Sequence, residues 1–170
     1  GSNEYLDIAV PRTDKKVGIG HKGFEVITDG VDIITDLKRR DFTINSIAIN
    51  LKNLKIVDPF NGINDINNKI LRATNDESFI DDPLRILRGI QFAARFGFKI
   101  EPHTLKLMKE NSYLIKELPG ERIFDELQKI VNKQGNTDLA FDLIRETDID
   151  KVLFGKKMIS YNNFGNLDKI

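Results

Sequence analysis

The chain has 170 residues, enough for a substantial hydrophobic core in one domain or in parts of two. Its 26 basic residues equal its 26 acidic residues, so no global positive field indicates nucleic acid, and any polyanion site must be a local patch. The absence of cysteine excludes disulfides and thiolate metal sites and fits a cytoplasmic location, and neither a membrane-length apolar run nor a signal-peptide pattern is present.

The N-terminal part predicts two strands joined by a basic, glycine-rich loop. Residues 5–10 alternate between apolar and polar side chains, which is typical of a half-buried strand, and residues 24–28 predict a second strand. Lysines in the loop are candidate phosphate contacts, with a plain surface turn as the alternative. These lysines are Lys15, Lys16 and Lys22.

Residues 18–23 match the pattern GxGxxG letter for letter. In dinucleotide-binding proteins a helix follows this pattern at once, so that the pyrophosphate lies at the helix N-terminus. Here a short β-rich segment follows, and a turn at Asp29 and Gly30 ends it. We therefore reject a dinucleotide-binding interpretation.

Residues 33–48 predict one or two helices that break near Arg40 and Asp41. Arginines at such a break can clamp phosphate oxygens, and Asp or Asn side chains can bind a ribose hydroxyl. A solvated charged turn is the alternative. The candidate nucleotide-binding residues are Arg39, Arg40, Asp41 and Asn45.

A hairpin and a turn are expected next. Residues 48–50 and 55–58 predict the two strands of a hairpin. Residues 58–65 carry turn chemistry, because Pro fixes one dihedral angle and Gly permits a positive φ. Their spacing differs from that of an EF-hand loop, which favours a structural connector over a calcium site.

The segment with the most informative chemistry opens a predicted helix at 83–96. Pro83 suits the first helical position, Asp82 suits the N-cap, and Arg85 follows one turn later on the same side. Cytosine and adenine present an exocyclic amine beside a ring-nitrogen acceptor, whereas guanine and uracil present the reverse order. A fixed pair of Asp82 and Arg85 could therefore bind C or A and reject G and U. The alternative is a helix cap with a local ion pair.

The same helix predicts a row of arginines. Arg85, Arg88 and Arg95 project within a narrow sector, which suits a triphosphate or an RNA backbone. An exposed basic face is the alternative. A neighbouring apolar stripe comprises Leu87, Ile90 and Ala94.

Further helices are predicted at 102–111, 121–132 and 138–146, and a loop after Phe154. Strands followed by helices, without alternation, indicate an α+β fold in front of an all-helical module.

Two other candidates for metal binding are weak. Asp148 and Asp150 imitate the paired aspartates of two-metal nucleotide transfer, but they follow a helix rather than a glycine-rich turn, so we assign them to a helix-end loop. His21 and His103 are too isolated in the sequence for a metal site.

Taken in order, five segments resemble motifs of class II tRNA nucleotidyltransferases, the CCA-adding enzymes, whose relatives include bacterial poly(A) polymerases. Residues 39–45 resemble the nucleotide-sugar motif, 58–65 the motif that joins head to neck, and 81–85 the nucleotide-template motif. Residues 121–127 resemble the following neck motif, and 11–24 fit the segment upstream. The order of the five makes the resemblance specific.

The resemblance implies part of a polymerase-β-like nucleotidyltransferase head, with a small mixed sheet and helices, followed by an all-helical neck and the start of a helical body. The expected boundaries are 3–75 for the C-terminal part of the head, 76–135 for the neck and 136–170 for the start of the body.

The resemblance also implies transfer of CMP and AMP from CTP and ATP to the tRNA 3′ end without a nucleic-acid template. Asp82 and Arg85 would be the protein template, and Arg88 would contact base or triphosphate. Asp81 would support them, although the family usually has Glu there. Sugar and phosphate contacts would fall to Arg39, Arg40, Asp41 and Asn45, and RNA or phosphate contacts to Arg95, Lys15, Lys16 and Lys22.

One departure from the family concerns catalysis. The family's Gly-Ser or Gly-Gly element and its Asp-x-Asp pair, which hold Mg²⁺ for two-metal catalysis, are absent from this sequence. Asp7 could approach the metals as a third carboxylate, but a lone carboxylate does not hold a metal pair. We therefore expect a piece of a longer Mg²⁺-dependent enzyme that is inactive by itself.

Several functions stay open. A poly(A) polymerase or an A-adding or CC-adding relative shares these motifs, and a non-catalytic nucleotide- or RNA-binding module or a helical adaptor is a further alternative. The expected partners are tRNA, CTP and ATP, with no membrane, and the sequence does not indicate an oligomeric state.

Overall fold

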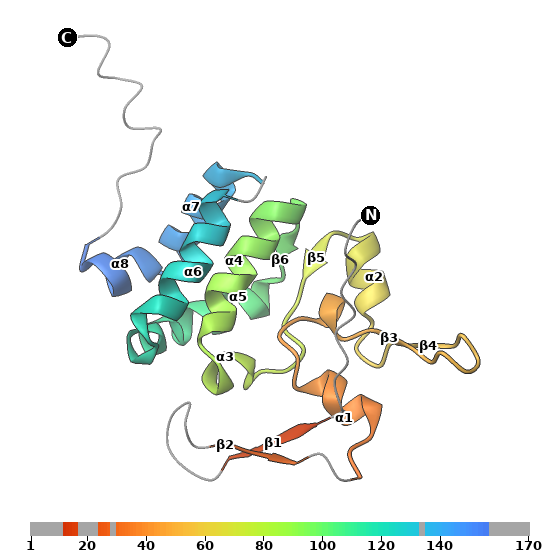
Figure 1. Cartoon of the computed structure of the whole chain (residues 1–170). Coiled ribbons are helices and arrows are strands. Elements are labelled where there is room, and N and C mark those ends of the chain that lie inside the picture. Colours follow the sequence, from red (N-terminus) through yellow and green to blue (C-terminus); the bar gives the residue numbers. More distant parts are fainter. Residues whose placement is uncertain (1–11, 17–23, 28–29, 133–134, 157–170) are drawn as a thin grey trace, which may run out of the picture.

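The computed structural model describes residues 12–16, 24–27, 30–132 and 135–156 (Figure 1). Helices predominate, and short strands pair into three two-stranded sheets. The strands are β1 (Thr13–Lys16), β2 (Phe24–Ile27), β3 (Ala48–Ile49), β4 (Ile56–Val57), β5 (Ile70–Leu71) and β6 (Lys99–Ile100). The α-helices are α1 (Ile33–Lys38), α2 (Gly62–Asn67), α3 (Ser78–Asp81), α4 (Leu84–Phe96), α5 (Pro102–Glu110), α6 (Gly120–Asn132), α7 (Thr137–Glu146) and α8 (Ile149–Phe154).

The first sheet corrects one sequence prediction. The expected strand at 24–28 is confirmed as β2, but its antiparallel partner is β1, with Thr13 opposite Ile27. Lys15 and Lys16 therefore lie in a strand and not in the loop where we expected them. The polar sequence of β1 has no period of two in hydropathy, so it gave no strand signal. The strand predicted at 5–10 lies outside the described residues.

The segment from α1 to the hairpin follows the prediction. Helix α1 ends at Lys38, and a 3-10 turn at Thr43–Asn45 follows, so the expected break near Arg40 is confirmed. The backbone of Phe42 pairs with that of Ala73, which ties this break to the chain after β5. Strands β3 and β4 form the predicted antiparallel hairpin.

Helix α2 was not predicted, because its residues have the composition of a turn. The Asp58 carboxylate accepts hydrogen bonds from the backbone N–H groups of Gly62 (2.7 Å) and Ile63 (2.9 Å) and so starts the helix. A Cβ on Gly62 would lie 2.2 Å from the carbonyl oxygen of Thr43, so this close approach requires glycine. The Asp65 carboxylate accepts from the Thr43 hydroxyl at 2.7 Å, which agrees with a structural connector.

Helix α4 is the centre of the fold, and it packs against α6 and α7 (Figure 1). Its predicted apolar stripe of Leu87, Ile90 and Ala94 is buried, and its predicted end is confirmed by the left-handed Gly97 that caps it. The parallel pair of β5 and β6 lies beside it. The largest fully buried apolar side chains are Phe42, Phe79, Leu37, Leu71, Ile86, Leu87, Ile90, Met108, Ile115 and Ile149.

The end of the described chain differs from the prediction of a helix-end loop. Helix α7 ends at Glu146, and the chain turns at Asp148, whose φ is 59°, so that α8 starts directly afterwards. Ile149 and Asp150 lie in the first turn of α8 and are fully buried. The loop predicted beyond Phe154 lies mostly outside the described residues.

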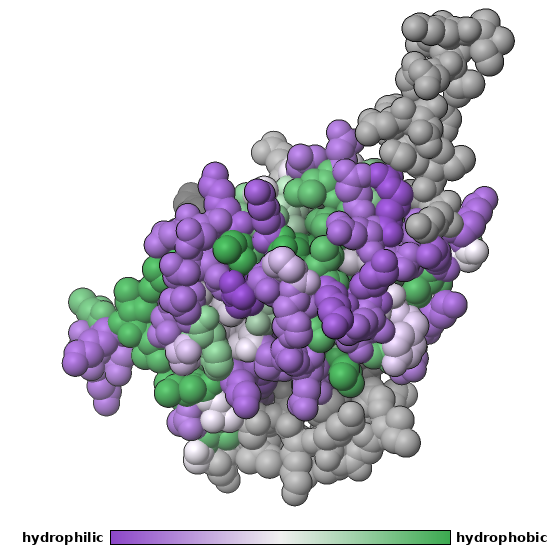
Figure 2. Space-filling model, turned by 180° about the vertical axis from the view of Figure 1, so that it is seen from behind, coloured by the Kyte–Doolittle hydropathy of each residue, from purple (hydrophilic) through white to green (hydrophobic). Residues whose placement is uncertain are grey.

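The β3–β4 hairpin projects from the rest of the molecule (Figure 1). Its apolar side chains are exposed and contribute to the green surface at the left of Figure 2. These side chains are Ile49, Leu51, Leu54 and Ile56. In the part of the chain that the structure describes, no helix is long and apolar enough to cross a membrane.

Candidate nucleotide-binding cavity

A cavity of about 540 Å³ opens where the break after α1 meets the first turns of α4 and the start of α6. Most of the residues that the sequence analysis proposed for nucleotide binding line it. The lining residues are Arg39, Arg40, Asp41, Asn45, Asp82, Leu84, Arg85, Arg88, Phe92 and Arg122.

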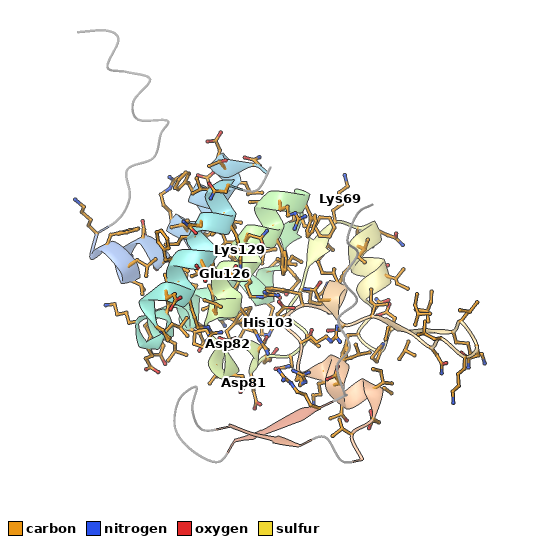
Figure 3. All side chains as sticks on the ribbon, in the orientation of Figure 1. Lys69, Asp81, Asp82, His103, Glu126 and Lys129 are labelled. Atoms are coloured by element: carbon orange, nitrogen blue, oxygen red, sulfur yellow. The ribbon has the colours of Figure 1, made fainter. Side chains whose placement is uncertain are left out.

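The start of α4 places Asp82 at the cavity. Asp82 has an extended backbone, Pro83 has a φ of −59°, and an Asp82 carboxylate oxygen accepts from the backbone N–H of Leu84 at 3.2 Å. The side chain of Asp82 thus caps the helix start as predicted, but α4 begins at Leu84, one residue after the Pro83 that was expected to open it. Figure 3 shows Asp81 and Asp82 at the lower end of α4.

Asp82 and Arg85 line the same cavity but do not form the ion pair that we considered. Arg122, from α6, donates to Asp82 Oδ2 at 3.2 Å. Arg85 donates to the Ser78 hydroxyl at 2.9 Å and to the backbone carbonyl of Arg39 at 2.6 Å. The acceptor of Asp82 and the donors of Arg85 are thus held separately, by groups on other segments of the chain, instead of by each other.

Asp41 is buried at the centre of the opposite side of the cavity. Its Oδ1 accepts from the Phe42 N–H and the Asn45 side-chain amide, each at 2.9 Å. Its Oδ2 accepts from Arg88 Nε at 2.9 Å and Nη2 at 2.7 Å. Asp41 therefore fixes the position of Arg88 while about a third of the Arg88 side chain (37%) stays exposed.

Asp36 holds the two neighbouring arginines. Its carboxylate is buried and bonds Arg39 at 2.6 Å and Arg40 at 3.3 Å, and it accepts from the Arg12 backbone N–H at 3.1 Å. Burial alone would raise the pKa of Asp36, but the hydrogen bonds from Arg39, Arg12 and Arg40 outweigh it and lower that pKa below its usual value. Asp36 is therefore a carboxylate that orients arginines toward the cavity.

Some candidate residues lie elsewhere. Arg95 is exposed and does not line the cavity, so its contact with RNA or phosphate stays a prediction. Ten residues along a helix correspond to about 15 Å, which places Arg95 far from Arg85. Asp81 precedes the cavity without lining it. Lys22 and Asp7 lie outside the described residues.

The sequence analysis missed three lining residues. Arg122 belongs to the segment at 121–127 that we compared with the neck motif, but nothing local linked it to Asp82, forty positions earlier. Phe92 and Leu84 fall within the apolar pattern of α4. Such a pattern predicts side chains packed in the core and gives no sign that they line a cavity. A contact between two helices could have revealed Arg122, but a pattern within one helix could not.

The residues that line the cavity favour a ligand that has both an anionic group and a ring able to form hydrogen bonds. Five arginines surround two carboxylates, and both carboxylates are paired with arginine. Arginines suit phosphate oxygens, while a carboxylate beside guanidinium N–H groups can bind a base edge. Within the described ranges, no group of three or more His, Cys, Asp or Glu residues could hold a metal ion, so these residues do not fit a Mg²⁺ site.

Two family models match the chain. Residues 1–72 match the "Poly A polymerase head domain", and residues 97–160 match the "Probable RNA and SrmB- binding site of polymerase A". The lining residues come from the first match, from the segment between the two matches, which includes most of α4, and, through Arg122, from the second match.

Named relatives agree with these matches. The chain is 42% identical over 154 residues to a multifunctional CCA protein of Acinetobacter baumannii (strain AYE), covering 87% of this chain and 37% of that protein. A multifunctional CCA protein of Shewanella frigidimarina is also 42% identical, with 36% of its length covered. The chain thus spans little more than a third of the curated relatives it matches.

Solved structures share the fold. An apo CCA-adding enzyme matches with a TM-score of 0.80 at 32% identity, covering 96% of this chain and 39% of the other. A Thermotoga maritima CCA-adding enzyme complexed with tRNA matches at 0.70 and 36% identity, covering 80% and 36%. A CCA-adding enzyme with CTP matches with a TM-score of 0.70 at 36% identity, covering 80% of this chain and 35% of the other. A CCA-adding enzyme with ATP matches with a TM-score of 0.68 at 36% identity, covering 78% of this chain and 33% of the other. The chain belongs to the tRNA nucleotidyltransferase and poly(A) polymerase family, the family of the CCA-adding enzymes.

Proposed function

We propose that this chain is the nucleotide-selecting part of a cytoplasmic tRNA nucleotidyltransferase that adds C and A, from CTP and ATP, to the tRNA 3′ end. The observation that carries this proposal is the presence of Asp82 and Arg85 in one cavity with four further arginines. The relatives named as CCA-adding enzymes, with CTP, ATP or tRNA, support the same assignment.

Base selection follows from the order of donors and acceptors. The Asp82 carboxylate accepts from the exocyclic amine of cytosine or adenine, and Arg85 donates to the adjacent ring nitrogen. Guanine and uracil would place a carbonyl against the carboxylate and an N–H against the guanidinium, and both contacts are repulsive. Because Arg122 donates to Asp82 Oδ2 in this structure, the base amine has to share that carboxylate with Arg122 or displace it.

The other side of the cavity serves the parts that all nucleotides share. Arg39, Arg40 and Arg88 are oriented by carboxylates and supply donors to the phosphates. Asp41 and Asn45 are hydrogen-bonded to each other, and we assign them to the ribose hydroxyls. Asp81 supports the start of α4.

The division into head (3–75), neck (76–135) and body (136–170) fits this arrangement. The cavity lies between the head and helices α4 and α6 of the neck. The head supplies Arg39, Arg40, Asp41 and Asn45 to the sugar and phosphates, and the neck supplies the base contacts Asp82 and Arg85 together with one phosphate contact, Arg88. The pairing of β5 with β6 and the hydrogen bond from the Ala73 N–H to the Thr104 hydroxyl (3.0 Å) join the two units.

Nucleotidyl transfer in this family uses Mg²⁺, and the described residues do not supply its ligands. We therefore assign binding and selection of the nucleotide to this chain and derive no catalytic step from it. With tRNA that lacks its terminal A, Mg²⁺ and labelled ATP, we expect this chain to bind ATP without incorporating it. Robust incorporation would contradict that assignment.

The test of the function itself is competitive nucleotide binding. Wild-type chain should bind CTP and ATP in preference to GTP and UTP, and Asp82→Ala should lose this preference. A second candidate is addition of A alone, which the poly(A) polymerase family models favour. Equal affinity for CTP and ATP supports CCA addition, and binding of ATP without CTP supports the second candidate.

A further inference from the structure

A ladder of aromatic rings runs along α4, away from the cavity. Phe92 lines the cavity, contacts the buried Phe42 edge-on at 6.0 Å between ring centroids, and stacks on Phe96 at 6.0 Å with an interplanar angle of 18°. Phe96 then contacts Phe98 at 5.8 Å. The ladder begins in the core and ends at the surface, because Phe96 is 45% exposed whereas Phe42 is fully buried.

Two arginines lie over this ladder. The guanidinium carbon of Arg88 is 5.2 Å from the centre of the Phe92 ring, and that of Arg95 is 5.2 Å from the Phe96 ring. Arg88 is paired with Asp41 in the cavity. Arg95 is exposed, and among the described residues no carboxylate forms an ion pair with it.

Two lysines add positive charge at the same end of α4. Lys99 follows Phe98 by one residue, and its backbone N–H donates to the Lys69 carbonyl at 2.9 Å. Both lysines are exposed, and Figure 3 shows Lys69 at the opposite end of α4 from Asp82. No carboxylate of the described residues forms an ion pair with either lysine. We call Phe96, Arg95, Lys99 and Lys69 the distal patch.

We infer that the distal patch binds the single-stranded 3′ end of the RNA substrate, a role that rests on the proposed function. Exposed rings with cations beside them are the combination that binds single-stranded nucleic acid, because rings stack on bases and cations neutralise the phosphates. Phe96 follows Arg88 by eight positions on the helix, a rise of about 12 Å, or roughly three stacked bases at about 3.4 Å each. A short unpaired 3′ end can therefore extend from the patch to the cavity.

The exposure of the patch favours single-stranded over double-stranded RNA. A duplex offers its phosphates and 2′-hydroxyls but no free base face, so the lysines alone would suffice for it. Phe96 is 45% exposed, and an unstacked base can stack on its ring in place of the Arg95 guanidinium, which then turns to a phosphate. Removal of the Phe96 ring should therefore affect RNA with an unpaired 3′ end and leave a blunt duplex unaffected.

The test is fluorescence anisotropy with two labelled RNA hairpins, one with a short unpaired 3′ end and one blunt. Wild-type chain should bind the first more tightly. Phe96→Ala should weaken that binding about fivefold or more and leave blunt binding unchanged, given the usual value of base stacking on an aromatic ring. Tyr113→Ala removes another exposed aromatic ring outside α4 and should change neither.

Two further variants separate stacking from folding and from charge. Phe96→Trp should preserve binding, whereas Phe96→Leu, which retains apolar packing, should weaken it like Phe96→Ala; circular dichroism checks that each variant is folded. The combined variant Arg95→Gln and Lys99→Gln should reduce the slope of log K against log salt by about 1.4. Full binding by Phe96→Leu, or equal losses for both hairpins, would overturn the inference.

CTP binding in the same samples separates this inference from the proposed function. The Phe96 variants should bind CTP like the wild type, because Phe96 does not line the cavity. If CTP binds and RNA binding is absent or insensitive to Phe96, only the distal patch is wrong. If the wild type binds no CTP, the proposed function fails and the inference fails with it.

Discussion

The two sides of the cavity are held in different ways. On the α1 side (Arg39, Arg40, Asp41 and Asn45), the buried carboxylate of Asp36 binds Arg39 and Arg40, and Arg40 donates to the backbone carbonyl of Asn45. The Asn45 amide in turn donates to the buried carboxylate of Asp41, which also binds Arg88, so these contacts form a continuous network. On the α4 side (Asp82, Arg85 and Arg122), each charged group is held by one or two contacts from another helix or loop.

This difference matches what each side would bind. A network fixed before the ligand arrives is suited to the sugar and phosphates, which are the same in every nucleotide. Groups held by few contacts keep exposed donors and acceptors for the base, which varies. The comparison predicts that changes on the α1 side affect stability or all nucleotides alike, and that changes on the α4 side affect the choice among bases.

The largest effect is expected from Asp41→Ala. It removes the acceptor of Arg88 and leaves the Phe42 N–H and Asn45 amide without their partner, at a cost of about 2–3 kcal/mol in the free energy of unfolding. Urea denaturation followed by circular dichroism measures this. Asp41→Asn, which keeps one acceptor oxygen, is the control and should lose less. An unchanged unfolding midpoint in Asp41→Ala would show that the network is not structural.

The next effect is expected from Arg85→Ala on base selection. It should reduce the difference in binding free energy between CTP and UTP by about 1–3 kcal/mol, as for other bidentate contacts to bases. Calorimetric titration with all four nucleoside triphosphates measures this. An equal loss of affinity for all four would assign Arg85 to the phosphates and remove the distinction between the two sides.

A smaller and uniform effect is expected from Arg39→Ala. Its guanidinium is partly exposed, at 26% of the side chain, and its loss should weaken all four nucleotides by about 1 kcal/mol. Inorganic tripolyphosphate should show the same loss, because it has no base. Lys52→Ala, at the tip of the hairpin, is the matched control with no expected change. A loss confined to one base would contradict the phosphate role.

The smallest effect concerns the pH dependence of stability. The pKa of Asp36 is lower in the folded chain than its usual value, so its ionised form stabilises the fold at all pH values above about 4. This contribution disappears as the pH falls below about 4, through the folded pKa. The difference in unfolding free energy between wild type and Asp36→Asn should therefore be constant from pH 7 to about 5 and shrink below about 4. A difference that grows in acid would contradict this assignment.

The features that were predicted correctly depend on interactions between residues close together in the sequence. The cap at Asp82, the helix after Pro83, the buried stripe of α4 and the hairpin before Asp58 depend on residues within one or two turns of each other, and all are confirmed. The residues of the cavity were mostly identified for the same reason, since their chemistry is visible in short motifs.

Distant contacts explain what was missed. The hydrogen bond from Arg122 to Asp82 and that from Arg85 to the Arg39 carbonyl join residues forty or more positions apart, and no periodicity in one helix contains them. The strands β5 and β6 have two residues each, too few for an alternating pattern. Helix α2 starts from a side-chain cap four residues upstream, which the composition of a turn conceals.

Titration of the wild-type chain with CTP, ATP, GTP and UTP, repeated with Asp82→Asn, tests the central claim most directly. The account predicts that CTP and ATP bind at least about tenfold more tightly than GTP and UTP, and that the variant loses this ratio while keeping a common residual affinity. Four equal affinities in the wild type, or an unchanged ratio in Asp82→Asn, would contradict it.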